Sequence, residues 1–112
     1  MLLVAGCAPA AAPAPPTSAA TAAPAAAPDL RHGRDVADRN CSLCHAIDPG
    51  GTSPHPRAPA FAALGGRIDI GALRGPLTRG DIVGHQGMPQ IELPPRDADD
   101  LIAYLESLQP TR

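Results

Sequence analysis

The chain has 112 residues and a formal charge of -2, enough for one folded domain. Its nine basic residues, all arginine, are offset by eleven acidic ones, which excludes the strong positive field of a nucleic-acid-binding protein. Aromatic residues are 2% of the chain: one Phe, one Tyr and no Trp. Aromatic side chains normally supply much of a small core, so something else must fill the middle of this domain. Three cysteines, an odd number, argue against a closed disulfide framework and favour chemistry at the thiols.

The segment 1–7 is short and apolar and ends in Val4-Ala5-Gly6-Cys7. This tetrapeptide resembles a bacterial lipobox, where a signal peptidase cuts and the new N-terminal cysteine carries lipid. Only six residues precede Cys7, fewer than the basic and apolar regions of a secretory signal require. Either the true start lies upstream of Met1, which we favour, or the match is accidental. No run of about 18 apolar residues follows, so we expect no membrane-spanning helix.

Residues 8–29 are predicted to form a disordered tether. Up to residue 28 they are only Ala, Pro, Thr and Ser, and six prolines exclude a long alanine helix. Such a spacer reaches on the order of 60 Å when extended at about 3.1 Å per residue. The folded domain is therefore placed at 30–112.

The pattern of this domain predicts helices and no strands. A first helix running into Cys41 is indicated by residues at helical spacing, Gly33, Val36, Ala37 and Asn40. The Pro- and Gly-rich stretch 48–59 is predicted as loop. Short helical stretches are expected over 60–64, 68–77 and 79–85. A last helix is expected to have Asp97 as its N-cap and to end before Pro110. No segment alternates with period two, so the fold class is all-α.

The pentapeptide Cys41-Ser42-Leu43-Cys44-His45 is a C-x-x-C-H run, the attachment signature of a c-type haem. Two thiols three positions apart reach the two vinyl groups on one porphyrin edge, and the following imidazole comes under the iron. His45 is then the proximal ligand. A thioredoxin-like redox pair would require a preceding strand, a zinc site would require more ligands than His55 and His85 supply, and a structural disulfide would leave His45 idle.

A single covalently held haem c also answers the shortage of aromatic residues. It is a large, flat, apolar body, around which about eighty residues can wrap one core. The cofactor would then be the centre of the domain.

The segment 30–112 resembles a small bacterial class I cytochrome c. The matching features are the helix before Cys41, the C-x-x-C-H run, Ala58-Pro59-Ala60-Phe61, Gly84-His85-Gln86-Gly87-Met88-Pro89, and Asp100-Leu101-Ile102-Ala103-Tyr104-Leu105. The resemblance implies an all-α fold in which N- and C-terminal helices cross at Gly33 and Tyr104. It also implies Met88 as the sixth iron ligand. Apart from Met1, Met88 is the chain's sole methionine, and a soft thioether suits haem iron. A further implication is that the carbonyl of Pro59 accepts the proximal imidazole's N–H.

Two features depart from the family pattern. Ala37 stands where an aromatic residue is common, and there is no Trp to bond a haem propionate. Arg67 is a propionate partner by charge alone, although a solvated arginine explains it equally well. His85, three residues before Met88, is a rival sixth ligand that would give a bis-His haem of lower potential. His32 and His55 are expected at the surface.

The sequence therefore predicts an electron carrier, not an enzyme, with both axial positions filled. We expect a monomer that meets donor and acceptor proteins transiently. Its predicted place is the periplasm or cell envelope of a bacterium, held to a membrane through lipid on Cys7. Two alternatives stay open: a cytochrome subunit of a membrane-bound dehydrogenase or oxidase complex, and a haem-based gas or redox sensor.

Overall fold

The computed structural model describes residues 2–3, 6, 8–12, 27–81 and 87–110. Cys7, most of the predicted tether and His85 lie outside these residues. The described part of the folded domain is helical and contains no strand, in agreement with the all-α prediction. No helix among the described residues has the length and apolar character needed to cross a membrane.

The first helix, α1, spans Leu30–Asn40 and begins three residues earlier than the periodicity indicates. Asp29 caps it, because its side chain accepts a hydrogen bond from the His32 backbone N–H at 3.0 Å. Gly33, Val36 and Ala37 form its buried face.

The middle of the domain is built from short elements. The 3-10 helices η1 and η2 span Phe61–Gly66 and Ile70–Leu73, and α2 spans Arg74–Arg79. η1 continues two residues beyond the predicted stretch 60–64, through Gly65 and Gly66. The Gln109 side chain supports this end, because it accepts from the Gly65 N–H at 2.8 Å. The helical stretch expected over 79–85 does not begin at Arg79, which is the last residue of α2; Gly80 ends that helix at a φ of 72°. Residues 82–85 lie outside the described residues.

The last helix, α3, spans Pro95–Ser107. Asp97 is not its N-cap as predicted. Pro94 occupies that position and Pro95 starts the helix, since proline is already set to a helical φ and its missing N–H is not needed there. Asp97 lies in the first turn, where its charge complements the helix dipole.

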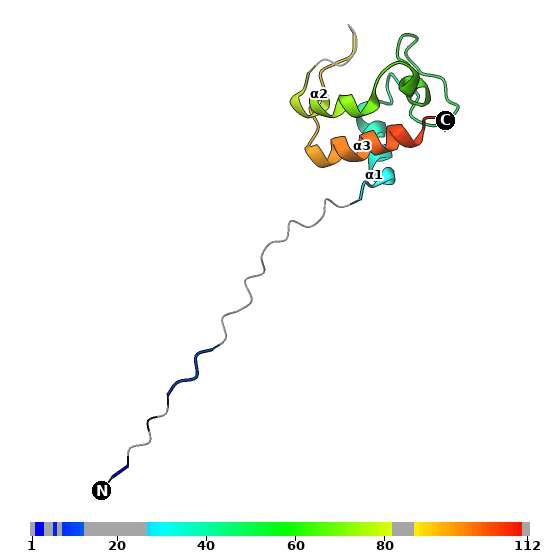
Figure 1. Ribbon diagram of the computed structural model, residues 1–112. Coiled ribbons are helices and arrows are strands. Elements are labelled where there is room, and N and C mark those ends of the chain that lie inside the picture. The colour runs from blue at the N-terminus through cyan, green and yellow to red at the C-terminus, as the bar shows by residue number, and fades with distance from the viewer. Residues whose placement is uncertain (1, 4–5, 7, 13–26, 82–86, 111–112) are drawn as a thin grey trace.

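Helices α1 and α3 cross and form the main contact between elements, with α2 lying along α3 (Figure 1). They approach closely at Gly33, where any Cβ would overlap the backbone carbonyl of Asp100 and the Cβ of Tyr104. The crossing of terminal helices at Gly33 and Tyr104 is thus present.

Asp100 secures the same crossing with its side chain, which is fully buried. The carboxylate accepts from the Asp29 backbone N–H at 2.9 Å and contacts His32 Nδ1 at 2.6 Å and Arg96 Nε at 3.1 Å. Burial alone would raise the pKa of Asp100, but the bonds from His32 and the Asp29 N–H, with the Arg96 charge, outweigh it and lower the pKa. The start of α1 is therefore fixed on α3.

His32, expected at the surface, keeps 34% of its side chain exposed. Its ring also contacts Asp100 and, at 3.4 Å, Asp97. His55 is exposed as expected.

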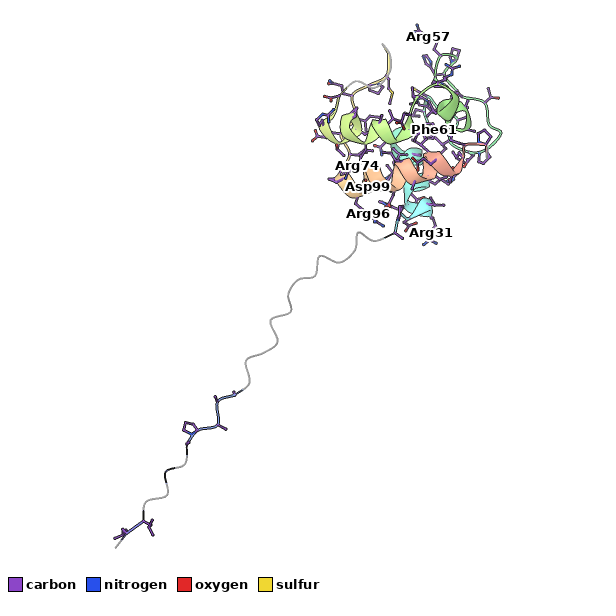
Figure 2. All side chains as sticks on the ribbon, in the orientation of Figure 1. Arg31, Arg57, Phe61, Arg74, Arg96 and Asp99 are labelled. Atoms are coloured by element: carbon purple, nitrogen blue, oxygen red, sulfur yellow. The ribbon has the colours of Figure 1, made fainter. Side chains whose placement is uncertain are left out.

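The core gathers between α1, α3 and the short elements. Its buried members are Val36, Ala37, Ile47, Phe61, Leu64, Ile70, Leu77, Leu93, Ala98, Leu101, Tyr104 and Leu105. Figure 2 shows the single Phe, Phe61, inside this domain. Half-buried Cys41 and Met88 pack against the same cluster, so residues of the predicted site border the core.

Candidate haem site

The C-x-x-C-H run continues directly from the end of α1 as a tight turn. The backbone N–H groups of Cys44 and His45 both bond to the carbonyl of Cys41, at 3.2 and 2.9 Å. This turn keeps the two cysteines three residues apart on a helix-like path, where side chains at that spacing share a face. No disulfide joins them.

The two thiols are half-buried. Burial raises the pKa of the Cys41 thiol to about 11. A redox-active cysteine has a lowered pKa, so these surroundings do not favour a redox-active pair. This environment suits attachment of an apolar group against the core.

His45 is buried and its ring is held on two sides. Its Nδ1 lies 2.7 Å from the carbonyl oxygen of Pro59, and its ring centre lies 5.2 Å from that of Phe61. A carbonyl can only accept, so Nδ1 carries the proton and donates. With Nδ1 bonded to Pro59, Nε2 is the ring nitrogen that could bind a metal.

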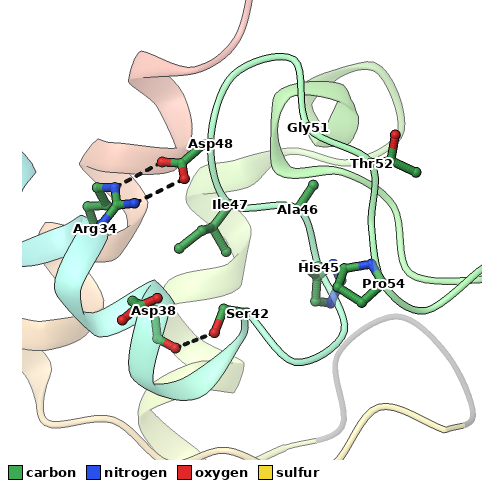
Figure 3. Close-up of a pocket in the computed structure, with 10 residues that line it drawn as sticks. All are labelled: Arg34, Asp38, Ser42, His45, Ala46, Ile47, Asp48, Gly51, Thr52 and Pro54. Carbon is green, nitrogen blue, oxygen red and sulfur yellow. Dashed lines mark hydrogen bonds and ion pairs between the residues drawn. The ribbon is translucent and has the colours of Figure 1, made fainter.

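The segment after His45 borders an open surface pocket of about 270 Å³, drawn in Figure 3. Arg34 from α1 reaches across to Asp48 there, with Nε–Oδ1 and Nη2–Oδ2 distances of 2.9 and 3.0 Å. The hydrogen bond from Arg34 lowers the pKa of Asp48.

Met88 lies in the segment between α2 and α3, where its side chain is half-buried against the core cluster. Gly87 before it has a φ of 100°, a conformation that favours glycine. The chain beyond Met88 returns to α2 through a 2.8 Å bond from the Leu93 N–H to the Leu77 carbonyl. His85, the rival ligand, is outside the described residues.

Arg67 follows η1 and is exposed. Its backbone N–H bonds to the Leu64 carbonyl at 2.9 Å. Among the described residues, no cluster of three or more His, Cys, Asp or Glu side chains is arranged to hold a metal ion.

Comparison with known families matches residues 30–109 to the family Cytochrome c. The chain belongs to this family. It is a small bacterial class I c-type cytochrome. It is 33% identical over 92 residues to Cytochrome c-552 of Bradyrhizobium diazoefficiens (strain USDA 110), an alignment covering 82% of this chain and 86% of that protein. No solved structure matched.

Membership brings one covalently attached haem c and the role of a haem electron carrier. The described residues of this cytochrome fit that group. The two cysteines share a turn, and the next residue is a buried imidazole whose Nδ1 bonds to the Pro59 carbonyl. A methionine packs beside the same core.

Three groups that shape the site were not anticipated from the sequence: the Arg34–Asp48 pair, the Tyr104 hydroxyl and the Asp100 carboxylate. Tyr104 donates to the Ile47 carbonyl at 2.7 Å. Asp97 lies in the first turn of α3, whereas Asp100 is buried at the helix crossing. A buried polar side chain at a helix crossing leaves no periodic signal in a single sequence.

We expect Cys41→Ser combined with Cys44→Ser to abolish covalent haem attachment, because thioether bonds require both sulfurs. Haem-peroxidase staining of denaturing gels, after acid–acetone extraction, measures this. Ser42→Ala is the matched control in the same turn and should keep the stained band. A stained band of wild-type intensity in the double variant would contradict the assignment.

Proposed function

We propose that this cytochrome carries one electron at a time between redox partner proteins of the bacterial periplasm or cell envelope. The observation that carries the proposal is the hydrogen bond between His45 Nδ1 and the Pro59 carbonyl, directly after the Cys41–Cys44 turn. This bond fixes the orientation of a buried imidazole, as a ligand of haem iron requires.

In this proposal Cys41 and Cys44 would hold the haem by thioether bonds, and His45 and Met88 would bind its iron. The bound haem would supply one-electron chemistry. Pro59 fixes the imidazole orientation and raises its basicity. The core residues around His45, such as Phe61, exclude water from the ligand.

With His45 and Met88 both bound to it, the haem iron would have no open position for substrate or oxygen, as an electron carrier requires. Arg67, which is exposed after η1, would pair with a haem propionate, a role that rests on its charge alone. Weak electron-transfer encounters bury less than about 1,200 Å², which fits a monomer that docks briefly.

The two alternative roles differ from a carrier in measurable ways. A subunit of a dehydrogenase or oxidase complex would contain the same domain and would co-purify with its partners in mild detergent. A gas sensor would release Met88 to admit a diatomic ligand.

We expect wild-type holoprotein to titrate as one single-electron redox transition and its reduced form to bind CO slowly or not at all at neutral pH. Optical spectra recorded during an anaerobic redox titration, followed by CO addition, measure both. Two separate transitions would contradict the single haem. Rapid CO binding would favour the sensor.

We further propose that lipid on Cys7 anchors the domain, with residues 8–29 as the tether. The described end of that segment is fastened to the domain: the Ala27 carbonyl accepts from Arg96 at 3.2 Å, and the Asp29 N–H bonds to Asp100. This junction is at the start of α1. Cys41 follows the other end of that 11-residue helix, about 16 Å away at 1.5 Å per residue. The anchor would therefore leave the cysteine turn free for docking.

Expressed from its true start, the protein should fractionate with membranes, and Cys7→Ser should move it to the soluble fraction. One acyl chain binds only marginally, so stable attachment requires more than one chain. Mass spectrometry of the N-terminal peptide identifies the lipid, and Ala8→Ser is the matched control. An unchanged membrane fraction for Cys7→Ser would show that the lipobox match is accidental.

A further inference from the structure

The three residues after His45, 46–48, are fixed by contacts from three separate parts of the domain. The Ala46 N–H bonds to the Ser53 hydroxyl at 3.0 Å, and the Ala46 carbonyl accepts from the Phe61 N–H at 3.0 Å. The buried Ile47 carbonyl accepts from the Tyr104 hydroxyl at 2.7 Å. Each of these hydrogen bonds has one end on Ala46, Ile47 or Phe61, within two residues of His45 or Pro59.

The bond between Ala46 and Phe61 is placed to control the proximal histidine. It joins the residue after His45 to the second residue after Pro59. The two backbone segments that carry the 2.7 Å contact between His45 Nδ1 and the Pro59 carbonyl are therefore bonded to each other beside that contact. A shift of residues 46–48 therefore changes the distance between the imidazole and its acceptor.

Both crossing helices hold the far end of this segment. Arg34 of α1 makes a bidentate ion pair with Asp48, as Figure 3 shows. Tyr104 of α3 bonds to Ile47, and its hydroxyl lies 3.5 Å from Asp48 Oδ1. Burial, followed by the Asp48 charge, raises the pKa of Tyr104, so the hydroxyl remains a donor at neutral pH.

We propose that Arg34, Asp48 and Tyr104 are positioning residues that tune the redox potential by holding residues 46–48, and with them the His45–Pro59 hydrogen bond. This rests on the proposed function, in which His45 binds the haem iron. The bond to Pro59 makes the imidazole more basic and so favours ferric iron. Loosening the segment weakens that bond and raises the potential.

The chain offers a matched control pair. Arg74 of α2 and Asp99 of α3 are similarly exposed, at 50% and 42%, against 44% and 53% for Arg34 and Asp48. Their contact, Nε to Oδ1 at 2.5 Å, joins α2 to α3 instead of reaching residues 46–48. Figure 2 labels this control pair beside α3.

The test compares Arg34→Gln, Asp48→Asn and Tyr104→Phe with Arg74→Gln and Asp99→Asn in the holoprotein. The measurements are the midpoint potential, the paramagnetically shifted His45 ring resonances of the ferric form, and amide hydrogen exchange at Ala46. Arg34→Gln and Asp48→Asn should both raise the potential and shift the resonances. They should speed Ala46 exchange about two- to fivefold, the factor that an exposed ion pair corresponds to. Tyr104→Phe, which keeps the ring packing but removes a buried hydrogen bond, should act more strongly.

The double variant Arg34→Gln/Asp48→Asn should shift the potential no further than the larger single change, because the two residues form one unit. The control variants should leave the potential and the His45 resonances unchanged.

Opposite shifts for Arg34→Gln and Asp48→Asn would reveal a charge effect at a distance and overturn positioning. Unmoved His45 resonances, or equal shifts in the control pair, would overturn it too. Wild-type holoprotein is checked first: failure to show His45 ligation there contradicts the proposed function itself. The two failures are thus distinguishable.

Discussion

The crossing of α1 and α3 at Gly33 and Asp100 is the contact on which the rest of this domain depends. It joins segments about seventy residues apart in the sequence, with the backbones touching because Gly33 has no side chain. The buried carboxylate of Asp100 ties the first residues of α1 to the same place. Once this end is fixed, the direction of α1 determines where Cys41 and the turn that follows it lie.

The same two helices also hold the residues that follow His45, the proposed proximal ligand. α1 contributes Arg34 and α3 contributes Tyr104, and both reach the residues after His45. The imidazole itself is held by Pro59 and Phe61, and in our proposal the two helices steady it through residues 46–48. A covalent haem would complete a core that contains one Phe and one Tyr. In this account the residues at the helix crossing and the haem together form one core.

Much of this could be predicted from the sequence because the signals are local. The C-x-x-C-H run, the apolar spacing in α1 and α3, and the all-α class each depend on residues close in the chain. The N-cap of α3 was misplaced, since Pro94-Pro95 competes with Asp97 for the helix start. The role of Asp100 and the Arg34–Asp48 pair could not be predicted, because each depends on which residues meet after folding.

The most direct measurement of the central claim, one haem held between His45 and Met88, compares Met88→Ala with His85→Ala in redox titrations with optical spectra. A thioether ligand raises the potential relative to a second imidazole. The account predicts that Met88→Ala lowers the potential and removes the weak red band typical of sulfur ligation, while His85→Ala leaves both unchanged. Loss of the low-spin spectrum in His85→Ala, with Met88→Ala unaltered, would contradict it and show a bis-His haem.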